Sequence, residues 1–218
     1  MKKINKLLMT SAIFASVFFS FTTNAQVSVK NFAGPSVEVG VQATKTKLTL
    51  LQTYDGSDDG LSQNNTNYLK KLSAQYGFET SINNLVIGLG ASYALGNATV
   101  HFVDCSCYDE FAKLKNAMSV YIEPTYVLND TTAVFGKLSY NRVNSTVYFY
   151  GDDPDAADSK TISGRGIGVG VTHFLTKDLF LKAEIESVYY GNNTYDGYDP
   201  YAAKTKQTNS TISLGVKF

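Results

Sequence analysis

Eight stretches of this chain alternate strictly between apolar residues and small or polar residues, and this pattern limits the folds open to it. The clearest stretch is the last, STISLGVKF, in which Ile212, Leu214, Val216 and Phe218 are the apolar members. Strict alternation is typical of a β-strand with different surroundings on its two faces. Because an unpaired strand exposes its backbone edge and promotes aggregation, a chain that ends on such a strand needs a partner for it.

Seven further stretches alternate in the same way, at residues 36–50, 69–82, 85–96, 118–128, 131–150, 162–175 and 179–186. Short connections follow the second, fourth and sixth stretches, at Asn83–Asn84 (a two-residue hairpin), Asn129–Asp130 and Thr176–Asp178. Long polar segments follow the other stretches, at residues 52–67, 103–111, 151–159 and 191–208. Bacterial outer-membrane barrels have an even strand number, short periplasmic turns and longer extracellular loops. The sequence therefore predicts an all-β, eight-stranded antiparallel up-and-down transmembrane β-barrel.

The N-terminus has the three parts of a secretory signal peptide. Lys2, Lys3 and Lys6 form a basic region, an apolar stretch follows, and Thr23-Asn24-Ala25 is a small-residue cleavage site. We predict a signal peptide at 1–25 and a mature barrel at 26–218; a retained membrane anchor is the alternative. The chain has 19 basic and 19 acidic residues, so removing three lysines leaves a net charge of −3. This charge gives no indication of nucleic-acid binding.

Charged residues recur on the polar face of the alternating stretches, which faces the lumen in a membrane barrel. These residues are Glu38, Lys71, Glu79, Glu123, Lys137, Lys182, Glu184, Glu186 and Lys217. Because an isolated buried charge is costly, the near balance of five acids and four bases predicts a lumenal ion-pair network.

Glycines and aromatic residues also follow the alternation. Most glycines of the strands, including Gly88, Gly90 and Gly96, have inward parity, which we interpret as relief of crowding in a narrow barrel rather than a ligand cavity. The aromatic residues Tyr76, Phe78, Tyr93, Tyr126, Tyr140 and Phe218 are predicted at the rims of the lipid-facing band. Arg165 and His173 have outward parity and are predicted at the loop side and the turn side, respectively.

Together these features resemble the small eight-stranded outer-membrane family that includes the OmpA transmembrane domain, OmpX and the opacity-type proteins. The stretch ISLGVKF resembles the C-terminal signal that the barrel assembly machinery recognises, with Phe218 as its terminal aromatic. The resemblance implies that the last strand closes against the first, which removes both sheet edges. It also implies a place in the bacterial outer membrane, with outer-membrane lipid and lipopolysaccharide as partners.

Enzymes that modify lipid A occur among barrels of this size, and nucleophilic catalysis needs a base close to a Ser, Thr or Cys side chain. The two histidines are His101, which has Asp104 and Ser106 nearby, and His173, which lacks the His-x-Ser arrangement of the lipid A deacylases. We predict neither an enzyme nor a cofactor. Cys105 and Cys107 are predicted to form a disulfide within their loop, with free thiols or an intermolecular bond as alternatives.

The loops are the predicted functional part. The segment from Asp55 only partly follows calcium-loop spacing, because Thr66 stands where a bidentate Glu is needed. We predict adhesion or surface interaction with a host or the environment, together with a role in envelope integrity. The fifth and sixth stretches exceed the ~10 residues that span a bilayer, which indicates a protruding β-ribbon resembling that of OmpX. The alternatives are a narrow porin-like channel, against which the lumenal charges argue, and a lipid A enzyme.

Overall fold

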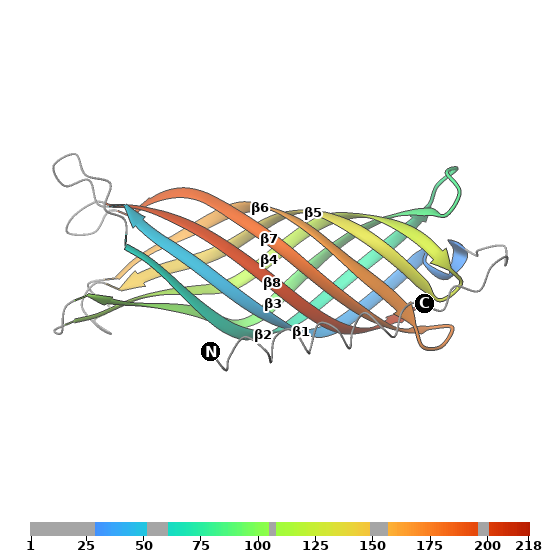
Figure 1. The fold of residues 1–218 in the computed structure, drawn as a ribbon, viewed down its shortest axis with the longest axis horizontal. Coiled ribbons are helices and arrows are strands. Elements are labelled where there is room, and N and C mark those ends of the chain that lie inside the picture. The colour runs from blue at the N-terminus through green and yellow to red at the C-terminus, as the bar shows by residue number, and fades with distance from the viewer. Residues whose placement is uncertain (1–28, 52–60, 105–107, 149–156, 196–200) are drawn as a thin grey trace, which may run out of the picture.

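The chain forms a closed barrel of eight antiparallel strands. The computed structural model describes residues 29–51, 61–104, 108–148, 157–195 and 201–218. The elements are a 3-10 helix, η1 (Val29–Asn31), and the strands β1 (Gly34–Leu51), β2 (Leu61–Glu79), β3 (Leu85–Asp104), β4 (Tyr108–Asn129), β5 (Thr132–Tyr148), β6 (Ala157–Phe174), β7 (Leu179–Tyr195) and β8 (Tyr201–Lys217). Each strand pairs with its neighbours in chain order (Figure 1). Within the described ranges no helix is long and apolar enough to cross a membrane. The predicted fold class is confirmed.

The last strand is not an edge, because β8 pairs with β1 from Ser36↔Lys217 to Leu51↔Ala202. Beyond the last rung, the amide of Phe218 donates a hydrogen bond to the carbonyl oxygen of Pro35 (3.0 Å). Closure therefore satisfies the backbone groups that a terminal strand would otherwise expose.

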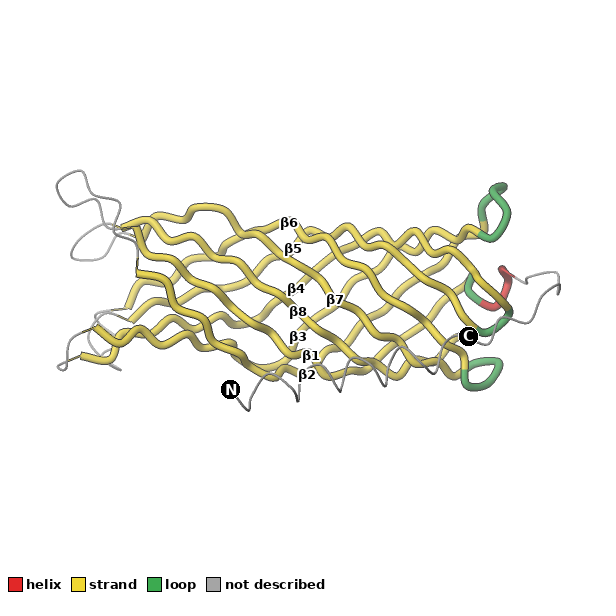
Figure 2. The backbone as a smooth tube through the Cα atoms, viewed as in Figure 1, coloured by secondary structure: helices red, strands yellow, loops and turns green. Residues whose placement is uncertain are grey.

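The strands are 17 to 22 residues long, about twice the 9–11 residues that cross a bilayer. Much of the sequence predicted as polar loops is therefore strand: β2 begins at Leu61, and β7 and β8 continue to Tyr195 and from Tyr201. The sequence predicted a protruding ribbon of the fifth and sixth strands alone, whereas all eight strands continue beyond the length that crosses a bilayer (Figure 2). Alternation alone missed these segments because both faces carry many polar residues.

The opposite end of the barrel carries the tight turns, η1 and the C-terminus (Figures 1 and 2). Residues 130–131 and 175–178 link β4 to β5 and β6 to β7, close to the predicted turns. The first turn is longer than the predicted two-residue hairpin and comprises residues 80–84. Thr80 explains the difference, because its hydroxyl accepts from the amide of Ile82 (3.2 Å) and donates to the carbonyl of Leu85 (2.8 Å). These bonds stabilise a wider turn that ends at Asn84 with a positive φ of 63°.

The outer face near the turn end is a continuous apolar band. Residues such as Val39, Ile167 and Ile185 are more than half exposed there, as expected for lipid-facing positions. Aromatic residues lie at its two borders, with Tyr76, Phe78, Tyr126 and Phe218 on the turn side and Tyr68, Tyr93, Tyr140 and Tyr189 on the other.

Three β-bulges separate this band from the part of the barrel beyond it, which we call the extension. Register shifts in β3, β4 and β7 coincide with positive φ angles at Gly96 (115°), Asn116 (56°) and Gly191 (75°). Gly96 keeps its predicted inward parity, because Ala94 and Ala98 are buried on either side of it and Gly96 lines an internal cavity beside Leu69. On β4 the inserted residue at Asn116 does break strict alternation, because the buried positions change from Ala112 and Leu114 to Ser119 and Tyr121. The sequence pattern alone could not place this bulge.

Candidate functional site: the closed lumen

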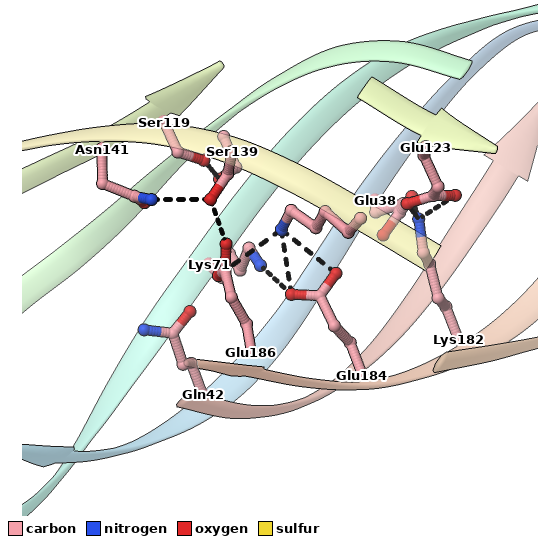
Figure 3. Close-up of polar contacts among 12 residues, drawn as sticks. Glu38, Gln42, Lys71, Ser119, Glu123, Ser139, Asn141, Lys182, Glu184 and Glu186 are labelled. Carbon is pink, nitrogen blue, oxygen red and sulfur yellow. Dashed lines mark hydrogen bonds and ion pairs between the residues drawn. The ribbon is translucent and has the colours of Figure 1, made fainter. Parts of the chain in front are cut away.

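The first half of a charged cluster in the lumen is centred on Glu184 of β7. Its Oε1 lies 3.2 Å from Nζ of Lys71 on β2 and 2.9 Å from Nζ of Lys137 on β5 (Figure 3). The same Lys137 Nζ lies 3.6 Å from Oε2 of Glu186. The other carboxylate oxygen of Glu186, Oε1, accepts a hydrogen bond from the Ser139 hydroxyl. All these side chains are buried, so three strands, β2, β5 and β7, are tied together across the lumen.

The second half is centred on Lys182, also from β7. Its Nζ lies 2.7 Å from Oε2 of Glu123 on β4 and 3.3 Å from Oε1 of Glu38 on β1. Gln75 on β2 donates to Glu123 (3.3 Å) and accepts from Lys182 (3.5 Å). A single lysine therefore contacts two buried carboxylates at once, as Figure 3 shows.

Seven of the nine predicted lumenal charges form this cluster, which we call the ion-pair layer: Glu38, Lys71, Glu123, Lys137, Lys182, Glu184 and Glu186. The other two occupy the ends of their strands, where the lumen opens. Glu79 is exposed, and Lys217 donates to the backbone carbonyl of Lys30. Within the described residues the layer therefore ends short of these two positions, which corrects the prediction for both.

Lumenal aromatic rings lie opposite glycines on the neighbouring strand. The directly opposed pairs are Tyr121 with Gly90, Phe135 with Gly170 and Phe180 with Gly215. A Cβ atom at any of these glycines would lie 2.2–2.4 Å from a ring atom, well inside van der Waals contact. These three inward glycines thus relieve crowding for a specific reason, because each leaves the space that one aromatic ring occupies.

Two of these rings cover the lysines of the ion-pair layer. Nζ of Lys137 lies 4.5 Å from the ring centroid of Tyr121, and Nζ of Lys182 lies 4.5 Å from that of Phe135. Such contacts stabilise a desolvated cation. They also fill the space beside the charges that water would otherwise occupy.

Apolar side chains fill the lumen of the extension. They form two clusters, one of Leu48, Val100, Ala112, Val147 and Ala203 and one of Ala98, Leu114, Val143, Ile162, Val188 and Tyr190. We call these clusters the upper apolar layer. The extension thus has an interior of apolar side chains, with the buried hydroxyl groups of Thr46, Ser145 and Thr205 among them, and a polar exterior. Sequence reasoning missed this layer because its residues lie in segments predicted as loops or at strand ends.

The N-terminal segment 29–33 closes the lumen at the turn end. Val29 and Phe32 pack against a buried cluster of Val86, Val127 and Ala133. The Phe32 ring makes an edge contact with Phe174 at 5.1 Å, and the ring of Phe174 lies 5.3 Å from that of Phe180. We call this segment the N-terminal plug.

Polar contacts hold the plug in place. Nδ2 of Asn31 donates to the carbonyl of Asp130 (2.9 Å), and Lys217 donates to that of Lys30. Gly77 permits the close approach, since a Cβ there would lie 2.6 Å from the carbonyl oxygen of Phe32. The sequence did not predict the plug, because a segment this short has no periodicity. The apolar residues Val29 and Phe32, between the signal peptide and the first strand, were the one available indication.

Small cavities remain in the lumen between the described residues, among them two of about 30 and 40 Å³. Gln42, Lys71 and Asn209 are among the residues that line the first, and Gln75 and Glu123 among those that line the second. Cavities of this size hold individual water molecules rather than a continuous column of water. Packing of the lumen therefore opposes conduction at several levels.

The remaining candidate residues are not assembled into a catalytic arrangement in the part of the chain that is described. His101 is exposed in the extension, whereas Nδ1 of His173 lies 2.9 Å from the Thr132 hydroxyl at the turn end. The two histidines are thus at opposite ends of the barrel. Cys105 and Cys107 lie outside the described residues, as does Ser106. Among the residues in view, no group of three or more His, Cys, Asp or Glu side chains is arranged to hold a metal ion.

The family model for the outer membrane protein beta-barrel domain matches residues 12–218. The chain belongs to this family, and it is a bacterial outer-membrane protein. The end with the tight turns is therefore periplasmic, and the extension lies outside the cell. Comparison with curated protein sequences gives no match.

Several solved barrels have a similar fold. The outer membrane protein OprG of Pseudomonas aeruginosa has a TM-score of 0.52 at 13% identity, over 85% of this chain and 96% of that one. The attachment invasion locus protein Ail of Yersinia pestis, in complex with the heparin analogue sucrose octasulfate, has a TM-score of 0.50 at 15% identity, over 85% and 99%. The protease OmpT of Escherichia coli also matches, with a TM-score of 0.43 at 12% identity, over 84% and 96%. At these identities the similarity concerns the fold alone.

Proposed function

We propose that this protein is a non-conducting surface scaffold, and that its extracellular β-tube and loops mediate adhesion or recognition at the cell surface. The observation that carries the proposal is the filling of the lumen at three levels: the N-terminal plug, the ion-pair layer and the upper apolar layer. A barrel filled in this way acts through its outer surface rather than through a passage.

The length of the strands supports the second half of the proposal. Strands of 17 to 22 residues continue well past the bilayer and raise the connections above the outer-leaflet surface. The upper apolar layer gives the tube a packed core of its own, so the loops stand on a rigid support. Rigid presentation lowers the entropy lost when loops bind a partner.

The name of one structural neighbour agrees with this direction. Ail is described as an attachment invasion locus protein, and adhesion by the present chain is a hypothesis of the same kind. The predicted role in envelope integrity is a further part of the proposal and follows from a rigid barrel within the membrane. Catalysis is not part of it, although the neighbour OmpT is a protease.

Conductance of the refolded mature chain in planar bilayers is the direct test of a closed lumen. We expect a silent bilayer from a preparation that migrates as a heat-modifiable barrel on gels. Steady and reproducible openings would instead support the narrow porin-like alternative.

Adhesion is tested by shortening one hairpin of the extension. Thr146 and Ser159 are paired across β5 and β6, so replacing residues 147–158 with a two-residue turn preserves the register below. Non-adherent bacteria that express the full chain should bind epithelial cells or abiotic surfaces more strongly than bacteria that express the shortened chain. Equal surface levels, measured by heat-modifiable migration, are the control. Adhesion no greater than that of the empty host would contradict the proposal.

A further inference from the structure

Outward-facing bases collect just beyond the lipid-facing band on six of the eight strands. Except on β2, where Tyr68 lies beyond Lys70, they follow the last exposed apolar residue of each strand in the extracellular direction: Lys45 and Lys47 on β1, Lys70 on β2, Lys113 and Lys115 on β4, Arg142 on β5, Arg165 on β6, and Lys204 and Lys206 on β8. On the two remaining strands, Leu95 of β3 lies opposite Lys70, and Tyr189 of β7 lies between Arg165 and Lys206. A belt of positive charge therefore lies directly above the extracellular aromatic border.

The charge is densest at the seam where the barrel closes. Lys47 on β1 and Lys206 on β8 are direct cross-strand partners, with Lys45 and Lys204 one step away on the same outer face. Directly opposed residues have Cβ atoms about 4.5–5.5 Å apart. We call these four residues the seam patch, and all four are exposed.

The strands beside the seam patch supply neutral neighbours. Lys45 and Lys47 pair with Thr66 and Asn64 on β2, and Lys204 and Lys206 pair with Asn192 and Tyr189 on β7. The glutamates of β1 and β7 point into the lumen. Like charges that face one another across a ladder are destabilising, so the described surroundings leave the repulsion within the seam patch uncompensated. A bound anion would remove it.

The position of the seam patch selects the kind of anion. Ala43 and Val41 precede the lysines on β1, and Ser210 and Ile212 occupy the equivalent places on β8. The patch therefore begins two residues above Ala43 on β1 and six residues above Ile212 on β8, so its lower lysines lie at the depth of the outer-leaflet head groups. Lysines at this depth contact ligands from the membrane plane, whereas a soluble ligand would reach the loops first.

We propose that the seam patch binds the phosphate groups of an anionic lipid in the outer leaflet, with the lipid chains against the apolar surface below. The belt of bases provides weaker contacts around the rest of the barrel. This site is independent of the proposed adhesion and would act in holding the barrel within its own leaflet.

Bisphosphorylated lipid A is a suitable probe. The mature chain, refolded in zwitterionic micelles, is titrated with this lipid and with its dephosphorylated form. We expect tighter binding of the phosphorylated form, and binding that weakens as salt is added. Each lysine near an anionic surface contributes about fivefold, so replacing all four seam lysines with Gln should weaken binding by at least tenfold. The double variant Lys47→Gln/Lys206→Gln, expected to have an intermediate effect, serves if the fourfold variant does not refold.

The matched control is Lys30→Gln/Lys177→Gln, which removes two exposed lysines from the periplasmic end and should leave the affinity within twofold. Equal affinity for the dephosphorylated lipid would overturn the proposal, as would an unchanged affinity of both the fourfold and the double seam variants. Sucrose octasulfate is the soluble-anion probe. Binding of that probe with equal affinity and the same lysine dependence would assign the seam patch to a soluble polyanion, and the lipid assignment would be wrong.

Discussion

Lys182→Met tests whether the ion-pair layer is a coupled unit. Nζ of Lys182 lies within 3.3 Å of oxygens of both Glu123 and Glu38, and its side chain is buried among aromatic rings. Methionine keeps a stem of similar length and apolar character, so packing changes little. The substitution therefore removes the charge and leaves two carboxylates without their common cation.

The magnitude follows from the charge count of the layer. Three lysines and four glutamates give a formal charge of −1, which becomes −2 in the variant. Removing one partner of a buried ion pair typically costs about 3–5 kcal/mol, because the remaining charge stays desolvated. We expect a loss of about this size in the free energy of unfolding, which is a large part of the roughly 5–15 kcal/mol of a typical domain.

The assay is urea-induced unfolding of the barrel in lipid vesicles, followed by heat-modifiable migration and tyrosine fluorescence. The matched variant is Lys182→Met/Glu123→Gln, which returns the formal charge of the layer to −1. It should recover at least half of the lost stability, and a double-mutant cycle with Glu123→Gln gives the coupling. A loss below about 1 kcal/mol in Lys182→Met, or additive effects in the cycle, would refute the coupled layer.

Three further predictions follow from single positions. Gly90→Ala should lower the free energy of unfolding by about 1–3 kcal/mol through overpacking against Tyr121. Gly136→Ala, which has only an ordinary contact on the outer face, should change it by less than about 0.5 kcal/mol. Equal losses in unfolding measurements would contradict this packing. Mass spectrometry of the chain secreted to the envelope should find an N-terminus at Gln26, and an uncleaved chain would support the retained anchor. Deletion of Phe218 should reduce assembly in cells while leaving refolding in detergent intact, and equal yields in cells would argue against an assembly signal.

Much of the fold followed from periodicity and charge. Alternation fixed which face of each strand points inward, and inward charges such as Glu184 and Lys137 then had to lie together because a narrow barrel leaves them no solvent. Strand order followed from connection length. The identity of the individual partners did not, because the pairing of Lys71 with Glu184 depends on register and shear, which set which inward residues share a level.

The rest could not be predicted because it depends on local interactions or on segments without a clear period. The plug at Val29 and Phe32 is too short for any pattern. The bulge at Asn116 inserts a residue, so the inward positions of β4 change from even numbers at Leu114 to odd numbers at Ser119, which strict alternation does not predict. The extension was interpreted as loop because polar residues occupy its outer face, and its inner face mixes small apolar residues such as Ala98 and Ala112 with polar residues such as Thr205.

The closed lumen also changes what a channel experiment on this barrel means. From the sequence, the ion pairs are the predicted seal, so replacing Lys137 and Lys182 with Ala would be expected to raise conductance. In the structure that layer lies between two apolar barriers, the N-terminal plug around Phe32 and the upper apolar layer around Val143. Barriers in series add their resistances, and water avoids a narrow apolar passage. Silence of the lysine variants would therefore leave the ion pairs untested as a seal, and their role is read from stability rather than from current.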